Sequence, residues 1–338
     1  MNILNIEHIH KIFGDKVIFD DISCGIDQGE KIGIIGVNGT GKTTLLRVIA
    51  GEEEPDEGQV ITQNGIRISW LPQTPEFPQH MTILDYVAEG KWQKDWSTES
   101  EARRMLNTLG ITDQNSNMDN LSGGEKKRVA LARMMIGEPE AILLDEPFSA
   151  LDGYLKDVLQ REMQDFLKDY PGDMILVTHS RDEAYKFCRE LSIVHEGRIL
   201  VTGETKQLFE RPGLLEAAKL TGCKNFSRAE RLGPHEIYAA DWKMKLHTEE
   251  NVDEDITHVG IRGHWIRPES EPGENCMAVQ VDQYIETTFE HQYMIRNKAE
   301  ENAAGLWWMR PKNSFTEDPD KDLPEYLYFP SEHLMLLK

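Results

Sequence analysis

Basic residues are scarce in this chain of 338 residues, which has 37 lysines and arginines against 59 aspartates and glutamates. The resulting formal charge of −22 argues against a broad nucleic-acid-binding surface, because such a surface needs clustered positive charge. We therefore expect no nucleic-acid partner. Cysteine is also rare, and its four positions are scattered without a C-x-x-C pair or metal-ligand spacing: Cys24, Cys188, Cys223 and Cys276. This usage predicts reduced, mostly buried thiols, as in a cytosolic protein.

Long apolar runs are absent as well, since no stretch approaches the roughly 20 apolar residues that a helix needs to cross a bilayer. Residues 1–7 lack the basic region and the long apolar region of a signal peptide. We therefore expect a soluble, cytoplasmic chain whose role at a membrane would come through a partner. The length is sufficient for two domains with a sizeable core.

The most informative stretch is Gly36–Thr43, because its sequence GVNGTGKT is a complete G-x-x-x-x-G-K-[ST] loop. It lies between an apolar run at 31–35 and a stretch with helical spacing at 44–50. Glycines in such a loop allow consecutive backbone N–H groups to turn toward phosphate oxygens. Lys42 can then reach the β- and γ-phosphates, and the Thr43 hydroxyl can hold Mg²⁺. A chance glycine-rich turn is the weaker interpretation, because strand, loop and helix all agree.

Two acidic residues follow the apolar run at 141–144, in a pattern typical of a buried strand. Asp145, at the strand end, can bind the Mg²⁺ that bridges the phosphates. Glu146 can polarise the attacking water as a general base. The alternative is a surface strand that ends in two solvated acids, which is improbable downstream of a phosphate-binding loop.

Apolar periodicity predicts the order of secondary structure. Strands are expected in the first 75 residues at 3–9, 17–19, 22–26, 59–62 and 66–71. Residues 82–137 are expected to be mainly helical, with Ser122 capping a helix that begins near Gly124 and ends at Met135. Strands and helices then alternate over 138–210, which predicts a mostly parallel sheet covered by helices.

The pattern changes after about Thr221. Short strands with period-two alternation, such as 277–281 and 289–295, are separated by proline and glycine. This texture predicts a small β-rich, barrel-like domain. The expected organisation is an α/β domain at 1–220, with a helical subdomain at about 82–137, and a β-rich accessory domain at 221–338.

The order of the motifs resembles that of the ATP-binding cassette (ABC) ATPases over roughly residues 1–220, which implies a P-loop NTPase fold. Leu121–Glu125 (LSGGE) is similar to the signature sequence of that family and opens a predicted helix. The remaining matches are one residue or short stretch each: Phe13 for the aromatic that stacks on adenine, Gln73 for the Q-loop, 149–152 for the D-loop and His179 for the switch histidine.

The resemblance implies that two copies of the chain close face to face around two ATP molecules with Mg²⁺. It assigns catalysis to Glu146, His179 and Gln73, and the metal to Thr43, Gln73 and Asp145. The nucleotide would be held by the aromatic, the phosphate loop and the strand-end acid of one chain, namely Phe13, Gly36, Asn38, Gly39, Gly41, Lys42, Thr43, Thr44 and Asp145. The other chain would supply Ser122, Gly123 and Gly124 at a helix N-terminus, which favours an anion.

Two parts of the sequence resemble different subfamilies. Residues 1–135 look like the ABC-F ATPases, which act on ribosomes, whereas residues 138–338 look like importer ATPases of the molybdate or tungstate type. Stretches of the second part carry the latter resemblance: 145–152, 178–184, 221–225 and 259–264. ABC-F proteins usually have two cassettes and a long charged linker, which this chain lacks. Importer ATPases usually have Gln where this chain has Glu125. A natural mosaic and an engineered one both stay open.

The leading hypothesis is the ATPase subunit of an ABC importer for an oxyanion such as molybdate or tungstate. Its expected partners are a second copy of the chain, transmembrane permease subunits and, indirectly, a periplasmic or lipoprotein substrate-binding protein. Such a subunit would be cytoplasmic and peripheral at the inner face of the membrane. The alternative is a soluble ABC-F-like ATPase that acts on the ribosome, although the charge of −22 weighs against it.

Overall fold

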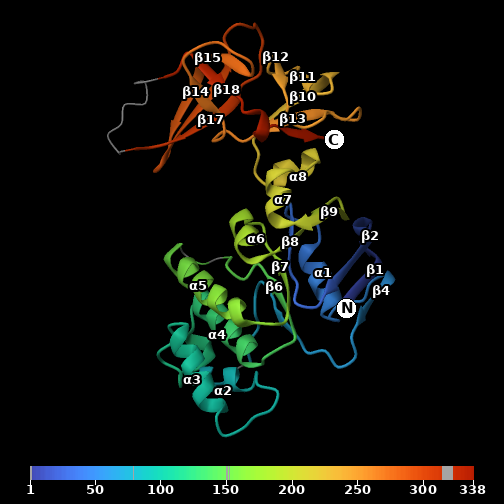
Figure 1. The fold of residues 1–338 in the computed structure, drawn as a ribbon. Helices are drawn as coiled ribbons and strands as arrows, with labels where there is room; N and C mark the ends of the chain where they lie inside the picture. Colours follow the sequence, from blue (N-terminus) through green and yellow to red (C-terminus); the bar gives the residue numbers. More distant parts are fainter. Residues whose placement is uncertain (1, 79, 150, 152, 314–322) are drawn as a thin grey trace. The chain divides into compact units, whose positions relative to one another are not determined.

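The computed structural model describes residues 2–78, 80–149, 151, 153–313 and 323–338. The chain divides into two compact units, Met1–Thr205 and Lys206–Lys338 (Figure 1). The sequence-based limits of 1–220 and 221–338 stay a prediction. Two short helices account for the difference, since α7 (Thr205–Glu210) and α8 (Leu215–Leu220) follow the point where the compact units divide.

A six-stranded sheet forms the centre of unit 1, in the order β5-β6-β7-β3-β8-β9. The first five strands are parallel and β9 pairs antiparallel with β8. The strands are β3 (Lys31–Gly36), β5 (Ile68–Leu71), β6 (Ala141–Asp145), β7 (Asp173–Val177), β8 (Glu190–His195) and β9 (Arg198–Glu204). Every residue of β6 and β7 is buried, because helices cover both faces of a parallel sheet. The predicted α/β class is therefore confirmed.

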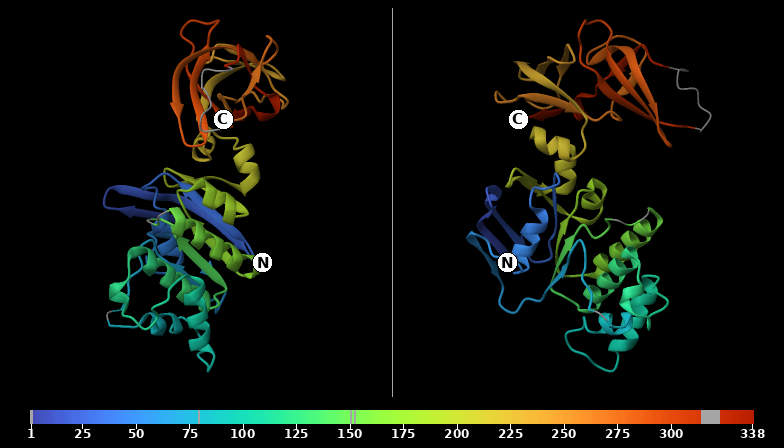
Figure 2. Two further views of the ribbon diagram at one scale, coloured as in Figure 1. Left: turned by 90° about the vertical axis from the view of Figure 1, so that its left-hand side faces the viewer. Right: turned by 180° about the vertical axis from the view of Figure 1, so that it is seen from behind.

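Helices cover this sheet and also form a separate group at one end of unit 1 (Figures 1 and 2). The first set is α1 (Lys42–Ile49), α5 (Gly153–Asp169) and α6 (Arg181–Phe187). The separate group is α2 (Ile83–Ala88), α3 (Thr98–Thr108), the 3-10 turn Met118–Asn120 and α4 (Gly123–Ile136). Thr82 and Ser122 cap α2 and α4 by accepting a backbone N–H three residues on, as their hydroxyls favour. The predicted helical region at 82–137 is thus present.

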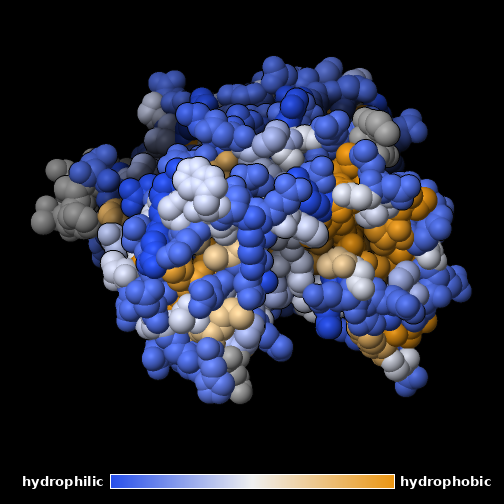
Figure 3. Space-filling view, turned by 90° about the horizontal axis from the view of Figure 1, so that it is seen from below, coloured by the Kyte–Doolittle hydropathy of each residue, from blue (hydrophilic) through white to orange (hydrophobic). Residues whose placement is uncertain are grey.

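A three-stranded antiparallel sheet, ordered β2-β1-β4, completes unit 1: β1 (Asn2–Phe13), β2 (Lys16–Asp27) and β4 (Glu57–Thr62). The prediction of two separate strands at 17–19 and 22–26 was wrong, because both belong to β2. Asp20 and Asp21 interrupt the apolar pattern there, and Asp21 has a φ of 67° where the pairing with β1 shifts register. Seen from below, the molecular surface is mainly hydrophilic, with apolar residues exposed in separate areas (Figure 3).

Unit 2 contains two five-stranded antiparallel sheets, ordered β12-β11-β10-β13-β19 and β14-β18-β15-β16-β17. The first consists of β10 (Asn225–Gly233), β11 (Glu236–Ala239), β12 (Met244–His247), β13 (His258–Ile261) and β19 (Met335–Leu337). The second consists of β14 (Arg267–Glu269), β15 (Cys276–Glu286), β16 (Glu290–Asn297), β17 (Leu306–Pro311) and β18 (Tyr326–Tyr328). Trp242, Tyr293, Trp308 and Phe329 are fully buried in one core. The β-rich character predicted for this region is confirmed.

Within the described residues, every helix is too short or too polar to cross a bilayer. All four cysteines are free thiols. Cys188 and Cys223 are buried, and burial raises the pKa of both thiols. Cys24 and Cys276 are half-buried, so two of the four thiols fit the prediction that most are buried.

Candidate active site

The loop that follows β3 has two positions that only glycine can occupy. A Cβ at Gly36 would lie 2.5 Å from the carbonyl oxygen of Val194. A Cβ at Gly41 would lie 2.3 Å from Cγ2 of Ile18, and Gly41 also has a φ of 85°. Gly41 is the N-cap of α1, so the loop presents the free N–H groups of a helix N-terminus. Such an end is a ready-made site for phosphate.

Lys42 brings a positive charge into this loop. Its ammonium is buried and donates hydrogen bonds to the carbonyl oxygens of Gly36 at 2.9 Å and Val37 at 3.1 Å. Burial lowers the pKa of Lys42, while the nearby carboxylates of Glu146 and Asp145 oppose this shift. The ammonium is thus held at the loop by neutral carbonyls, so its positive charge is available to attract an incoming anion.

A cavity of about 400 Å³ opens beside the loop, at the carboxyl ends of the parallel strands. It brings together residues that the sequence predicts for the site from four separate segments: Asn38, Gly39, Gly41, Lys42, Thr43, Thr44, Gln73, Glu146 and His179. Ile18 also lines it, and sequence reasoning missed this residue because an isoleucine in a strand carries no phosphate-binding signal. The position of this cavity agrees with the rule that α/β sheets bind ligands beyond the carboxyl ends of their strands.

Glu146 is fixed in place by its neighbours. Gln73 Nε2 donates to Glu146 Oε2 at 2.9 Å, and His179 Nδ1 lies 3.2 Å from Glu146 Oε1. The backbone of Glu146 has a φ of 46°, and its N–H donates to the carbonyl oxygen of Val177 at 2.9 Å. A left-handed non-glycine residue costs on the order of 1–3 kcal/mol and persists only where its surroundings hold it. The result is a carboxylate aimed into the cavity, where it can accept a proton from water.

Asp145 fits a magnesium ligand. Its side chain is fully buried, and neither carboxylate oxygen has a hydrogen-bond partner among the described residues. Burial raises the pKa of Asp145, while the nearby Thr43 hydroxyl opposes the shift. Mg²⁺ prefers such oxygen ligands and commonly shares them with phosphate. The described residues contain no group of three His, Cys, Asp or Glu side chains able to hold a metal alone, so the ion would depend on phosphate oxygens.

Several predicted residues lie outside the cavity lining. Phe13, at the end of β1, is 47% exposed, and Lys11 Nζ lies 5.1 Å from the centre of its ring. Ser122, Gly123 and Gly124 lie at the start of α4, where Ser122 and Glu125 form a reciprocal capping box. Their roles toward a nucleotide stay predictions. Of the predicted D-loop at 149–152, residues 150 and 152 lie outside the described residues.

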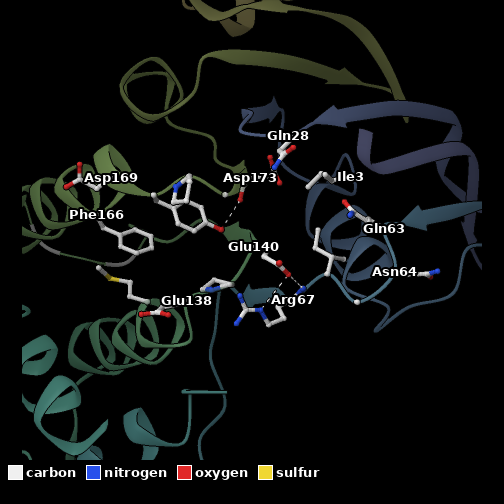
Figure 4. A pocket seen from close by; sticks show the side chains of 17 residues that line it. Ile3, Gln28, Gln63, Asn64, Arg67, Glu138, Glu140, Phe166, Asp169 and Asp173 are labelled. Carbon is white, nitrogen blue, oxygen red and sulfur yellow. Dashed lines mark hydrogen bonds and ion pairs between the residues drawn. The ribbon is translucent and has the colours of Figure 1, made fainter. Parts of the chain in front are cut away.

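A larger cavity, of about 640 Å³, lies at the opposite, amino edge of the central sheet (Figure 4). Arg67, Glu140 and Asp173 line it at the starts of β5, β6 and β7. Two of its carboxylates are already paired, since Glu140 accepts the N–H of Arg67 at 2.9 Å and Asp173 accepts that of Gly29. Its lining contains no phosphate-binding loop, so its size does not make it the nucleotide site.

Comparison with known proteins agrees with this geometry. Residues 19–149 match the family model described as ABC transporter. The Fe(3+) ions import ATP-binding protein FbpC of Haemophilus influenzae is 32% identical over 237 residues, covering 65% of this chain and 68% of that protein. The chain belongs to the ATP-binding proteins of ABC transporters. Members of this family are ATPases.

Other relatives of this ABC protein differ in how much of their length it spans. The uncharacterized ABC transporter ATP-binding protein YfmR of Bacillus subtilis is 35% identical over 219 residues, but only 34% of its length is covered. The spermidine/putrescine import ATP-binding protein PotA of Lawsonia intracellularis is 34% identical over 239 residues, with 63% of its length covered. The chain thus spans between a third and two thirds of these relatives.

Solved structures show the same fold. A nucleotide-free ATP-binding cassette from an ABC transporter matches with a TM-score of 0.54 and 25% identity, covering 64% of this chain and 99% of that one. A putative metal-chelate type ABC transporter in an inward-facing conformation matches with a TM-score of 0.56 at 22% identity, covering 69% of this chain and 94% of that one. The second likeness concerns the fold alone.

Proposed function

We propose that the chain is the ATP-hydrolysing subunit of an ABC importer and works as a dimer around two ATP molecules. One observation carries the proposal: the cavity at the carboxyl edge of the sheet collects Lys42, Gln73, Glu146 and His179 around one space. The order of these residues also matches a cassette, as described above. The reaction would convert ATP and water to ADP and phosphate.

The residues divide the work as follows in this proposal. The phosphate loop and Lys42 would bind the β- and γ-phosphates, and Thr43, Asp145 and Gln73 would hold Mg²⁺, which would supply positive charge against the phosphates. Glu146 takes the proton of the attacking water, and His179 contacts the γ-phosphate. The hydrogen bond from Gln73 to Glu146 and the 3.2 Å approach of His179 Nδ1 to the same carboxylate support this, because a base must be oriented before it can act.

The second chain would complete each site with Ser122, Gly123 and Gly124. In the single chain these residues lie outside the cavity lining, which fits a contribution in trans. Phe13 supports the adenine assignment, because an aromatic ring that is 47% exposed can stack on a base. Binding across the interface would couple nucleotide state to the distance between the chains.

A groove in unit 1 supports contact with a permease. Its cavity of about 570 Å³ lies between β5 and helices α2 and α4, close to Gln73 in the chain. Trp70, Tyr86 and Trp92 line it with Lys91 and Arg133, and Trp92 is 63% exposed. Aromatic and arginine side chains are enriched where proteins bind each other. A permease segment seated there would lie next to the glutamine that contacts Glu146.

The cargo in this proposal is inferred from sequence resemblance. Two relatives are named for import of Fe(3+) ions and of spermidine or putrescine. The resemblance of 221–225 and 259–264 to molybdate or tungstate importers favours an oxyanion. The cytoplasmic position at the inner face of a membrane, and an indirect link to a substrate-binding protein, follow from the same proposal.

Fractionation of the source cells tests the assembly. The importer proposal predicts that the tagged chain sediments with membranes and co-purifies with an integral membrane protein, and that replacing Trp92 with Ala weakens this association. Trp96, which is 95% exposed but does not line the groove, gives the matched control variant. Sedimentation with ribosomes and without a membrane partner would overturn the proposal and favour the ABC-F-like alternative.

A further inference from the structure

Lys127 is a buried cation that none of the motifs above includes. It lies on α4, one helical turn after Gly123, and is 8% exposed. Its ammonium donates to the carbonyl oxygen of Ser149 at 2.9 Å, to the hydroxyl of Ser149 at 2.7 Å and to the carbonyl oxygen of Glu146 at 3.2 Å. A lysine ammonium has three N–H donors, so these contacts use all of them.

The contacts of Lys127 meet the turn that carries the catalytic carboxylate. The N–H and the hydroxyl of Ser149 also donate to the carbonyl oxygen of Glu146, at 3.0 and 2.8 Å. The left-handed backbone of Glu146 is therefore held on both sides. Val177 accepts its N–H, and Lys127 with Ser149 binds its carbonyl. Loss of the ammonium would weaken the second restraint, because Ser149 would then hold the carbonyl of Glu146 without the lysine that fixes Ser149 itself.

Burial lowers the pKa of Lys127, and nearby carboxylates oppose this shift. Glu146, Asp145 and Glu183 all oppose the shift, so negative charge surrounds the site from β6, from the turn after it and from α6. Glu183 is itself buried, accepts a hydrogen bond from the Thr178 hydroxyl and pairs with Lys156 of α5 at 2.7 Å. A neutral residue at position 127 would leave two carbonyl oxygens without their cation.

We propose that Lys127 is a positioning residue that joins the start of α4 to Glu146. The inference rests on the proposed dimer, in which Ser122, Gly123 and Gly124 meet the partner's ATP while Glu146 serves the ATP of its own chain. Lys127 then connects the two ATP sites within one chain. When α4 contacts one ATP, Lys127 would transmit this contact to the turn that carries Glu146, the proposed base at the other ATP.

The test is steady-state ATP hydrolysis by the full chain with Lys127→Met, which keeps the side-chain length and removes the charge. We expect kcat to fall by about 10–100-fold, because a displaced catalytic group costs roughly this much. Binding of ATP should change less than threefold, and the Hill coefficient for ATP should fall from near 2 toward 1. Lys127→Arg, which keeps a buried donor, should restore part of both values. Lys168→Met, on the exposed end of α5, is the matched control.

The outcomes separate this inference from the proposed function. Wild-type protein that hydrolyses no ATP, or hydrolyses it as a monomer, would contradict the proposed function itself. Cooperative wild-type protein together with unchanged kcat and Hill coefficient in Lys127→Met would overturn only the role of Lys127. If Lys127→Met does not fold, Ser149→Ala removes the shortest of the three contacts, and an unchanged Hill coefficient in that variant would likewise overturn the role.

Discussion

Replacing Asp145 with Asn should stabilise the nucleotide-free protein while abolishing its hydrolysis. The carboxylate is fully buried, its oxygens lack hydrogen-bond partners among the described residues, and burial raises its pKa. A buried charged group without partners costs about 1–3 kcal/mol or more. Because the Thr43 hydroxyl and Lys42 offset part of this cost, we expect a gain of about 1–2 kcal/mol in the free energy of unfolding of unit 1. For a domain of this size, each kcal/mol of stability shifts the thermal unfolding midpoint by roughly 2–4 °C, so the midpoint should rise by about 2–8 °C.

Thermal unfolding of the full chain without nucleotide measures this, following the transition that belongs to unit 1. Asp165→Asn, on the exposed face of α5, is the control and should leave the midpoint unchanged. The sign of the pH dependence follows from the raised pKa. The cost of the ionised carboxylate is present above the folded-state pKa and disappears as the pH falls through it. The advantage of the variant should therefore shrink on acidification. The reasoning would be refuted if Asp145→Asn lowered the thermal unfolding midpoint, or if its gain in stability over the wild type grew as the pH fell.

Three further predictions concern the same site. Lys42→Ala should remove most binding of a fluorescent ATP analogue, since it deletes the cation at the phosphate loop; retained affinity would contradict the assignment. Hydrolysis should need more Mg²⁺ as the pH falls, because protons compete with the metal for Asp145. Since the pKa of Asp145 is raised, this effect should begin at a higher pH than for an ordinary aspartate; a magnesium titration at several pH values checks this. Glu125→Gln keeps the capping box but removes a negative charge from the start of α4, where the partner's ATP would bind. ATP-dependent dimerisation should therefore strengthen by up to about fivefold, or about 1 kcal/mol. Weakened dimerisation would argue against an anion near α4.

The sequence predicts the phosphate-binding loop and the strand-end acids well, because their chemistry depends on local order. Gly36, Lys42 and Asp145 need a strand before a loop, and apolar runs at 31–35 and 141–144 reveal those strands. The helix that Ser122 caps is equally local, since a hydroxyl and an acid three residues apart form the cap. These elements lie where the pattern places them.

Such local patterns do not predict contacts between residues that lie far apart in the sequence. Nothing in the residues around Lys127 indicates that its ammonium meets a turn 22 positions later, because a lysine on a helix is usually solvated. Ile18 lines the phosphate cavity only because β2 folds across the loop. The sequence predicts two strands where the structure has the single strand β2, since the irregular pairing at Asp21 depends on β1 rather than on local propensity.

Sedimentation velocity of the Glu146→Gln variant tests the central claim, which is that two chains clasp ATP before either hydrolyses it. The substitution keeps the shape of the side chain and removes the base, so bound ATP should persist. With Mg²⁺ and saturating ATP, the variant should sediment as a dimer, and it should return to a monomer with ADP. A variant that binds ATP and remains monomeric at every concentration would contradict the account.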